Sequence, residues 1–148
     1  MYKRQLLYRS TDQYKFATLF YGIIDTDTNT FRYANAGHNR PLFFRKGNKY
    51  EILETAGLVL GVLDDYHFSD NEINLSSGDL LLIYSDGVID SLNTNGEDFG
   101  EDRLIHLIEA NRDRMADEII SAIVESICSF SQGCEQFDDI TLVVVKKL

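Results

Sequence analysis

The sequence predicts an α+β fold in which antiparallel strands come first and two helices follow. Short apolar runs separated by Gly, Asn and Asp fill residues 16–90, which we interpret as a β-meander forming a sandwich or barrel. Apolar residues recur at helical spacing within 100–133, and β-branched residues dominate a final strand predicted over 138–147. We expect a single domain over 1–148, with 1–15 forming the end of a helix and a loop.

Strand signals follow one another along residues 16–85. The segment "FATLFYGIID" (16–25) is apolar on both faces, which predicts a central strand. After the turn "DTDTN", the segment "FRYANA" (31–36) is expected to return antiparallel to it. The segment "PLFFRKGNKYEIL" (41–53) predicts a hairpin around Gly47. Two more strands are expected within "YHFSDNEINL" (66–75) and "SSGDLLLIYS" (76–85).

Two amphipathic helices are expected after Gly100. In "EDRLIHLIEANRD" one face carries Leu104, Leu107 and Ile108. In "ADEIISAIVESICSF" the apolar face carries Ile119, Ile120, Ile123, Ile127 and Phe130. Each helix needs a sheet to cover its apolar face.

The composition excludes several classes of protein. The net charge of -10 argues against binding to nucleic acid, whose phosphates repel an acidic surface. No apolar run approaches the ~20 residues of a membrane span, and no signal-peptide pattern begins the chain. We therefore expect a cytoplasmic protein. Cys128 and Cys134 have neither metal-binding nor redox spacing, so we expect two reduced thiols.

The segment "LLLIYSDGVID" (80–90) is the first candidate for chemistry. Asp86-Gly87 is a strong turn signal, so an ordinary turn is one interpretation. The other is the edge of a site, because Asp90 follows four positions later and can place a second carboxylate on the same side of a helical turn.

A second pair of carboxylates, Asp138 and Asp139, begins the run "FDDITLVVV". One Asp at such a junction can cap backbone N–H groups, but two adjacent charges repel each other unless a cation or hydrogen-bond donors offset them. If the strands beside Asp86 and Asp138 pair, these carboxylates converge. Carboxylates without His or Cys suit Mg²⁺ or Mn²⁺, so an oxygen-ligand metal site is possible here.

The loop in "YANAGHNRPL" is the third candidate. His38 follows a glycine between two strands and is either solvated and bonded to backbone or functional. Asn35 is expected to be a turn residue or a backbone tether for the loop.

In their order along the chain, these segments resemble the SpoIIE-like branch of the type 2C (PPM) metal-dependent protein serine/threonine phosphatases. The matching stretches are "FATLFYGIID", "YANAGHNRPL", "GLVLGV", "LSSGDLLLIYSDGVID", "FGEDRL" and "FDDITLVVV". The combination of Ser-Asp-Gly with a later Asp-Asp-Ile-Thr is the specific part. The resemblance implies an antiparallel β-sandwich flanked by α-helices and a centre of two Mg²⁺ or Mn²⁺ ions. It also implies removal of phosphate from phosphoserine or phosphothreonine by metal-activated water.

The resemblance also assigns residues. It implies that Asp86 and Asp138 are metal ligands, with Gly87 adjacent through its backbone. Asp90 is a candidate ligand for a third metal, near which the loop of His38 would lie.

The same resemblance implies that other residues support this centre. Asp139 would orient its neighbour Asp138, and Asn35 would support the site from the loop. Arg40 replaces a common proline of the family's loop, where it could contact phosphate or point into water.

The sequence departs from the family's pattern at one important point. The family's site also uses a metal-bridging Asp from an upstream Asp-x-x-Gly-x-Gly motif, which does not occur in this sequence. We therefore expect an N-terminally truncated domain that binds metal weakly and has little or no turnover. The alternatives are a non-catalytic, degenerate phosphatase-fold module for protein–protein interaction and a small jelly-roll ligand-binding domain.

By resemblance, the partners would be a phosphorylated bacterial regulatory protein of the anti-sigma-factor antagonist type and an upstream sensor or receiver domain. Neither nucleic acid nor a membrane is expected as a partner.

Overall fold

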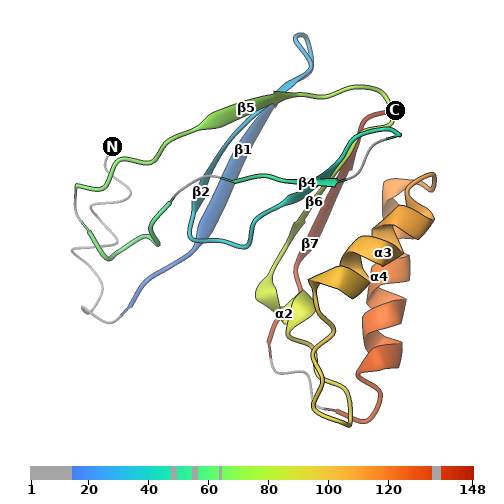
Figure 1. The fold of residues 1–148 in the computed structure, drawn as a ribbon. Coiled ribbons are helices and arrows are strands. Elements are labelled where there is room, and N and C mark those ends of the chain that lie inside the picture. The colour runs from blue at the N-terminus through green and yellow to red at the C-terminus, as the bar shows by residue number, and fades with distance from the viewer. Residues whose placement is uncertain (1–14, 48–49, 55–56, 64, 135–137) are drawn as a thin grey trace. The chain divides into compact units, whose positions relative to one another are not determined.

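A computed structural model describes residues 15–47, 50–54, 57–63, 65–134 and 138–148, which fall into two compact units (Figure 1). Unit 1 contains Met1–Arg40 and Leu53–Ser76, and unit 2 contains Pro41–Ile52 and Ser77–Leu148. Each unit contains one antiparallel sheet. The helix end and loop predicted over 1–15 lie, except for Lys15, outside the described residues.

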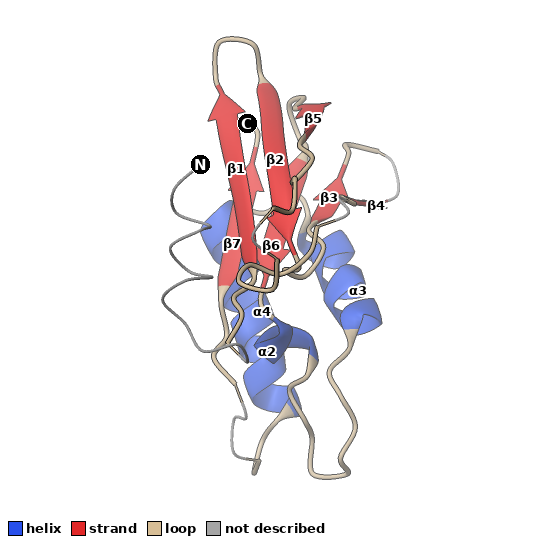
Figure 2. Cartoon of the chain, turned by 90° about the vertical axis from the view of Figure 1, so that its left-hand side faces the viewer, coloured by secondary structure: helices blue, strands red, loops and turns tan. Residues whose placement is uncertain are grey.

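The sheet of unit 1 has the strand order β1-β2-β5. Its strands are β1 (Leu19–Asp25), β2 (Thr30–Ala36) and β5 (Asn71–Asn74). The β1–β2 hairpin follows from its turn sequence, because the Asp25 carboxylate accepts the backbone N–H groups of Asp27 and Thr28 at 2.9 and 3.0 Å. Figure 2 shows the two long strands of this hairpin side by side. The predicted turn and antiparallel return are confirmed.

The prediction that β1 is a central strand is wrong for the described part of the chain, where β1 is an edge strand of its sheet. Only Phe20 of β1 is partly buried, and its ring stacks on Tyr33 at 5.8 Å between centroids. The opposite face leaves large side chains exposed, those of Leu19 (47%), Tyr21 (59%) and Ile23 (45%). An apolar pattern on both faces is therefore no guarantee of burial on both.

The sheet of unit 2 has the order β4-β3-β6-β7. Its strands are β3 (Leu42–Phe44), β4 (Tyr50–Ile52), β6 (Leu80–Tyr84) and β7 (Leu142–Lys146). The β3–β4 hairpin is confirmed. A simple meander is wrong, because β5 returns to β2 and β6 returns to β3. The last strand is also shorter than the predicted 138–147.

Three helices belong to unit 2: α2 (Asp86–Ile89), α3 (Glu101–Asn111) and α4 (Ala116–Phe130). The two predicted amphipathic helices, α3 and α4, are confirmed, and their apolar faces join the side chains of β3 and β6 in one core. The fully buried members of this core include Leu42, Leu80, Leu82, Leu104, Ile108, Ile119 and Ile123. The α+β class with antiparallel sheets is therefore confirmed. Among the helices of the described residues, none has the length and apolarity to cross a bilayer.

The orientation of α4 predicts that substitutions at two neighbouring positions affect stability very differently. Ile123 is fully buried at 0% exposure, whereas Val124 is 40% exposed. Ile123→Ala should lower the free energy of unfolding by about 2–5 kcal/mol, because the deletion leaves a cavity. Val124→Ala, the control, should change it by about 0.5 kcal/mol or less. Urea unfolding followed by circular dichroism measures both, and equal losses would contradict this helix orientation.

Candidate metal centre

The pairing of β6 with β7 places two distant acidic segments at one edge of the unit 2 sheet. The ladder is antiparallel and ends with Tyr84 opposite Leu142. One step further, the Ser85 N–H donates to the Thr141 carbonyl at 3.0 Å. The chain then continues into Asp86 on one side and comes from Asp138 on the other. The strand pairing on which the predicted convergence depended is confirmed.

Asp86-Gly87 begins the short helix α2 and does not form a hairpin turn (Figure 1). The Asp90 N–H donates to the Asp86 carbonyl at 2.9 Å, so the two acidic residues lie one helical turn apart. Gly87 is buried, and a Cβ at this position would lie 2.6 Å from the carbonyl oxygen of Asp139. The glycine is therefore needed for the close approach of α2 to the segment before β7.

Negative charge accumulates around α2. Asp90 is an exposed residue, yet partial desolvation of its carboxyl raises its pKa above the ordinary value of 3.8. The neighbouring carboxylates that raise this pKa further are those of Asp86, Asp98 and Asp138. Carboxylates from α2, from the loop after it and from the segment before β7 therefore lie near Asp90.

Asp98 was not identified from the sequence, because its loop residues "NTNGED" indicate only turns.

The adjacent pair Asp138 and Asp139 is held by its backbone. The Asp138 Oδ1 atom accepts the Asp139 N–H at 2.7 Å, which is the local capping considered from the sequence. The Asp139 carbonyl accepts a hydrogen bond from the Ser85 hydroxyl at 2.9 Å. The side-chain role of Asp139 stays a prediction.

The chemistry of the donors fits a hard divalent cation. Within the described ranges, no group of three or more His, Cys, Asp or Glu side chains is arranged to hold a metal ion. Mg²⁺ commonly keeps several waters and binds through only one or two carboxylates. The carboxylates of Asp86 and Asp138 are donors of the chemical type that such an ion takes, and their roles as ligands stay predictions.

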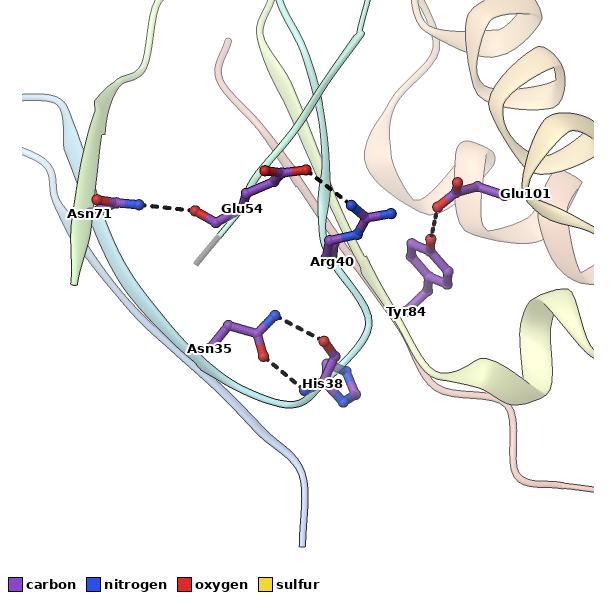
Figure 3. A network of polar contacts seen from close by, with 7 residues as sticks. All are labelled: Asn35, His38, Arg40, Glu54, Asn71, Tyr84 and Glu101. Atoms are coloured by element: carbon purple, nitrogen blue, oxygen red, sulfur yellow. Dashed lines mark hydrogen bonds and ion pairs between the residues drawn. The ribbon is translucent and has the colours of Figure 1, made fainter. Parts of the chain in front are cut away.

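The loop of unit 1 is organised by Asn35, which is 3% exposed. Its Oδ1 accepts the His38 N–H at 2.8 Å and its Nδ2 donates to the His38 carbonyl at 2.9 Å (Figure 3). Gly37 supports this loop with a φ of 72°. Asn35 is thus the backbone tether that the sequence suggested.

His38 and Arg40 also have partners within unit 1. His38 Nδ1 lies 3.3 Å from the Thr18 hydroxyl, and Arg40 Nη1 lies 3.0 Å from Glu54 Oε1. Both members of the Arg40 ion pair are more than half exposed, so water screens it. The roles of His38 near a metal and of Arg40 toward phosphate stay predictions.

A contact within unit 2 was missed from the sequence. The Tyr84 hydroxyl donates to Glu101 Oε1 at 2.5 Å, which connects the end of β6 to the first turn of α3 (Figure 3). No periodicity links residues 17 positions apart, so only the tertiary fold reveals it.

Known proteins are similar to this chain in sequence. The chain is 35% identical over 136 residues to Protein IcfG of Synechocystis sp., covering 90% of this chain and 21% of IcfG. It is 34% identical over 140 residues to the phosphoserine phosphatase RsbU of Bacillus subtilis, covering 94% of this chain and 41% of RsbU. The chain thus spans less than half the length of these relatives.

Solved structures share the fold. The SiaA-PP2C domain of Pseudomonas aeruginosa superposes with a TM-score of 0.79 at 19% identity, over 96% of this chain and 56% of that one. The catalytic domain of the serine threonine protein phosphatase PstP, in complex with two manganese ions, gives 0.69 at 12% identity, over 95% of this chain and 65% of that one.

The family assignment rests on nearly the whole chain. The family model of Stage II sporulation protein E (SpoIIE) matches residues 4–148. This match decides against the jelly-roll alternative. The chain belongs to the SpoIIE family.

Proposed function

We propose that the chain forms part of a metal-dependent phosphatase domain that removes phosphate from phosphoserine or phosphothreonine on a regulatory protein. The observation that carries the proposal is the pairing of β6 with β7, which puts Asp86 and Asp138 at one edge of a sheet. The surroundings of Asp90 agree with it, because partial desolvation and then the carboxylates of Asp86, Asp98 and Asp138 raise the pKa of Asp90.

Each acidic residue has a proposed role. Asp86 and Asp138 hold divalent cations, Mg²⁺ or Mn²⁺, and Asp90 contributes to a third ion. Asp139 keeps Asp138 oriented, since the Asp139 backbone N–H donates to the side-chain Oδ1 of Asp138. When bound, two such ions lower the pKa of a coordinated water and neutralise the phosphoryl oxygens during in-line attack.

The substrate class is supported by relatives. RsbU is a phosphoserine phosphatase, and PstP is a serine threonine protein phosphatase solved with two manganese ions. We propose a phosphorylated regulatory protein of the anti-sigma-factor antagonist type as substrate, with a sensor or receiver domain controlling the reaction in the parent protein.

We expect low activity from these 148 residues by themselves. The sequence contains no Asp-x-x-Gly-x-Gly motif, and two carboxylates leave much of the coordination of two ions to other groups. With Mn²⁺ present, hydrolysis of p-nitrophenyl phosphate should be weak or undetectable. Rates typical of complete type 2C domains would contradict this expectation.

Metal binding tests the proposed ligands directly. Asp86→Asn and Asp138→Asn should each weaken Mn²⁺ binding at least about tenfold, since even groups that only orient a ligand are worth about 10–100-fold. Titration calorimetry measures the affinity. Asp113→Asn, at an exposed position in the α3–α4 turn, serves as the control and should leave the affinity unchanged.

Two other results of this titration would count against the proposal. No heat with either the wild type or Asp86→Asn would favour the non-catalytic interaction module. If both Asp86→Asn and Asp138→Asn still show the heat of Mn²⁺ binding, the ion binds elsewhere on the chain.

The pKa of Asp90 predicts how stability depends on pH. Because the folded-state pKa lies above the ordinary value of 3.8, ionised Asp90 destabilises the metal-free fold. Stability is therefore lost as pH rises from that value through the raised pKa. Asp90→Asn should raise the free energy of unfolding at about pH 7 and lose this advantage near about pH 3.

Urea unfolding at both pH values, without metal, measures this effect. Asp113→Asn again provides the control and should show no such difference. A loss of stability in Asp90→Asn at neutral pH would mean that the carboxylate makes a favourable contact instead.

A further inference from the structure

Ser85 connects the two acidic segments through a single hydroxyl. Its Oγ donates to the Asp139 carbonyl and accepts the Thr141 N–H, each at 2.9 Å. Its own N–H donates to the Thr141 carbonyl at 3.0 Å. A serine hydroxyl can donate and accept at the same time, so one side chain ties two backbone positions of the facing segment.

We propose that Ser85 is a positioning residue for the metal centre, fixing the segment that carries Asp138 against the segment that carries Asp86. This inference rests on the proposed function, because it assigns Ser85 a purpose only if these carboxylates share cations.

The need for such a connection follows from where the sheet ends. The regular ladder stops at Tyr84 and Leu142, so residues 138–141 lie beyond it. The hydroxyl of Ser85 takes the place of the next ladder partner there. Without it, only water would remain to bond the Thr141 N–H and the Asp139 carbonyl, since both hydrogen bonds are exposed to solvent.

Gly87 restrains the same segment from α2. A Cβ built on Gly87 would meet the carbonyl oxygens of Asp139 and Asp138 at 2.6 and 3.2 Å. The backbone of 138–139 is therefore in contact with α2 as well as hydrogen-bonded to Ser85. Two independent contacts fix its position relative to Asp86.

Electrostatics explains why this restraint matters for affinity. Asp86 and Asp138 carry like charges on two segments whose backbones are in contact at Gly87, and like charges favour moving apart. Groups that hold metal ligands in place typically contribute about 10–100-fold to affinity. A segment already held by Ser85 loses less conformational entropy when a cation binds.

The chain offers a matched control. Ser91 Oγ donates to the Gly87 carbonyl at 2.7 Å, which is also a serine-to-backbone hydrogen bond but stays within α2 and its first following residues. Ser91→Ala removes a bond that involves no atom of residues 138–141. Ser85→Thr keeps a hydroxyl at the tested position.

The experiment compares Ser85→Ala, Ser85→Thr and Ser91→Ala in the 148-residue chain. Calorimetry with Mn²⁺ gives affinity, urea unfolding without metal gives stability, and amide hydrogen exchange reports on the Thr141 N–H. Ser85→Ala should weaken Mn²⁺ binding about 10-fold or more and speed exchange at Thr141. Ser85→Thr should restore both, and Ser91→Ala should change the affinity less than about threefold while lowering stability to a similar extent.

The possible failures can be told apart. If the wild type binds Mn²⁺ through Asp86 and Asp138, but Ser85→Ala binds equally well, the positioning role is overturned and the proposed function stands. If Ser85→Ala and Ser91→Ala weaken binding equally, the effect follows general stability and the role is again overturned. If the wild type binds no Mn²⁺, the proposed function fails and the positioning role fails with it.

Discussion

The antiparallel ladder between β6 and β7 is the interaction on which the candidate centre depends. It joins two segments that are far apart in the sequence, and its strands are held by a core of leucine and isoleucine side chains from β3, β6, α3 and α4. The hydrophobic effect stabilises this core, whereas the carboxylates lie just beyond the ladder. Packing thus brings together charges that would separate if electrostatics alone acted.

Residues named as site candidates differ in how well the fold itself explains them. Asn35 forms two hydrogen bonds with the backbone of His38, so its amide is accounted for without any ligand. Asp90 is the opposite case, because its surroundings raise its pKa and so make its ionised form less favourable than usual. A residue that is unfavourable for the isolated fold is a stronger candidate for chemistry than one that completes a loop.

Much of the fold could be predicted because its signals are local. The period of apolar residues defined α3 and α4, and turn residues defined the β1–β2 and β3–β4 hairpins. The predictions that failed concern tertiary structure. No pattern in β1 distinguishes an edge from a centre, and no propensity shows that β6 pairs with β3. Asp86-Gly87 has strong turn preference, but the packing of Gly87 against Asp139 accompanies a helical start instead.

Some residues of the candidate centre could likewise be predicted from the sequence, and others could not. Asp86, Asp90 and Asp138 stand out in the sequence because Asp90 follows Asp86 by four positions and Asp138 is followed directly by a second Asp. Asp98 and Ser85 do not stand out, since both belong to residue types common in turns. Only the folded structure reveals their neighbours. Asp98 contributes to the raised pKa of Asp90, and Ser85 forms a hydrogen bond with Asp139, 54 positions away.

The close approach at Gly87 has a consequence for the history of this family. Backbone atoms of the facing segment occupy the space that any side chain would need, whether or not an ion is bound. A descendant that abandoned catalysis could therefore exchange Asp86 for another residue yet would still have to retain its glycine neighbour. In such lineages, position 86 would record the loss of chemistry while position 87 would record the survival of the shape.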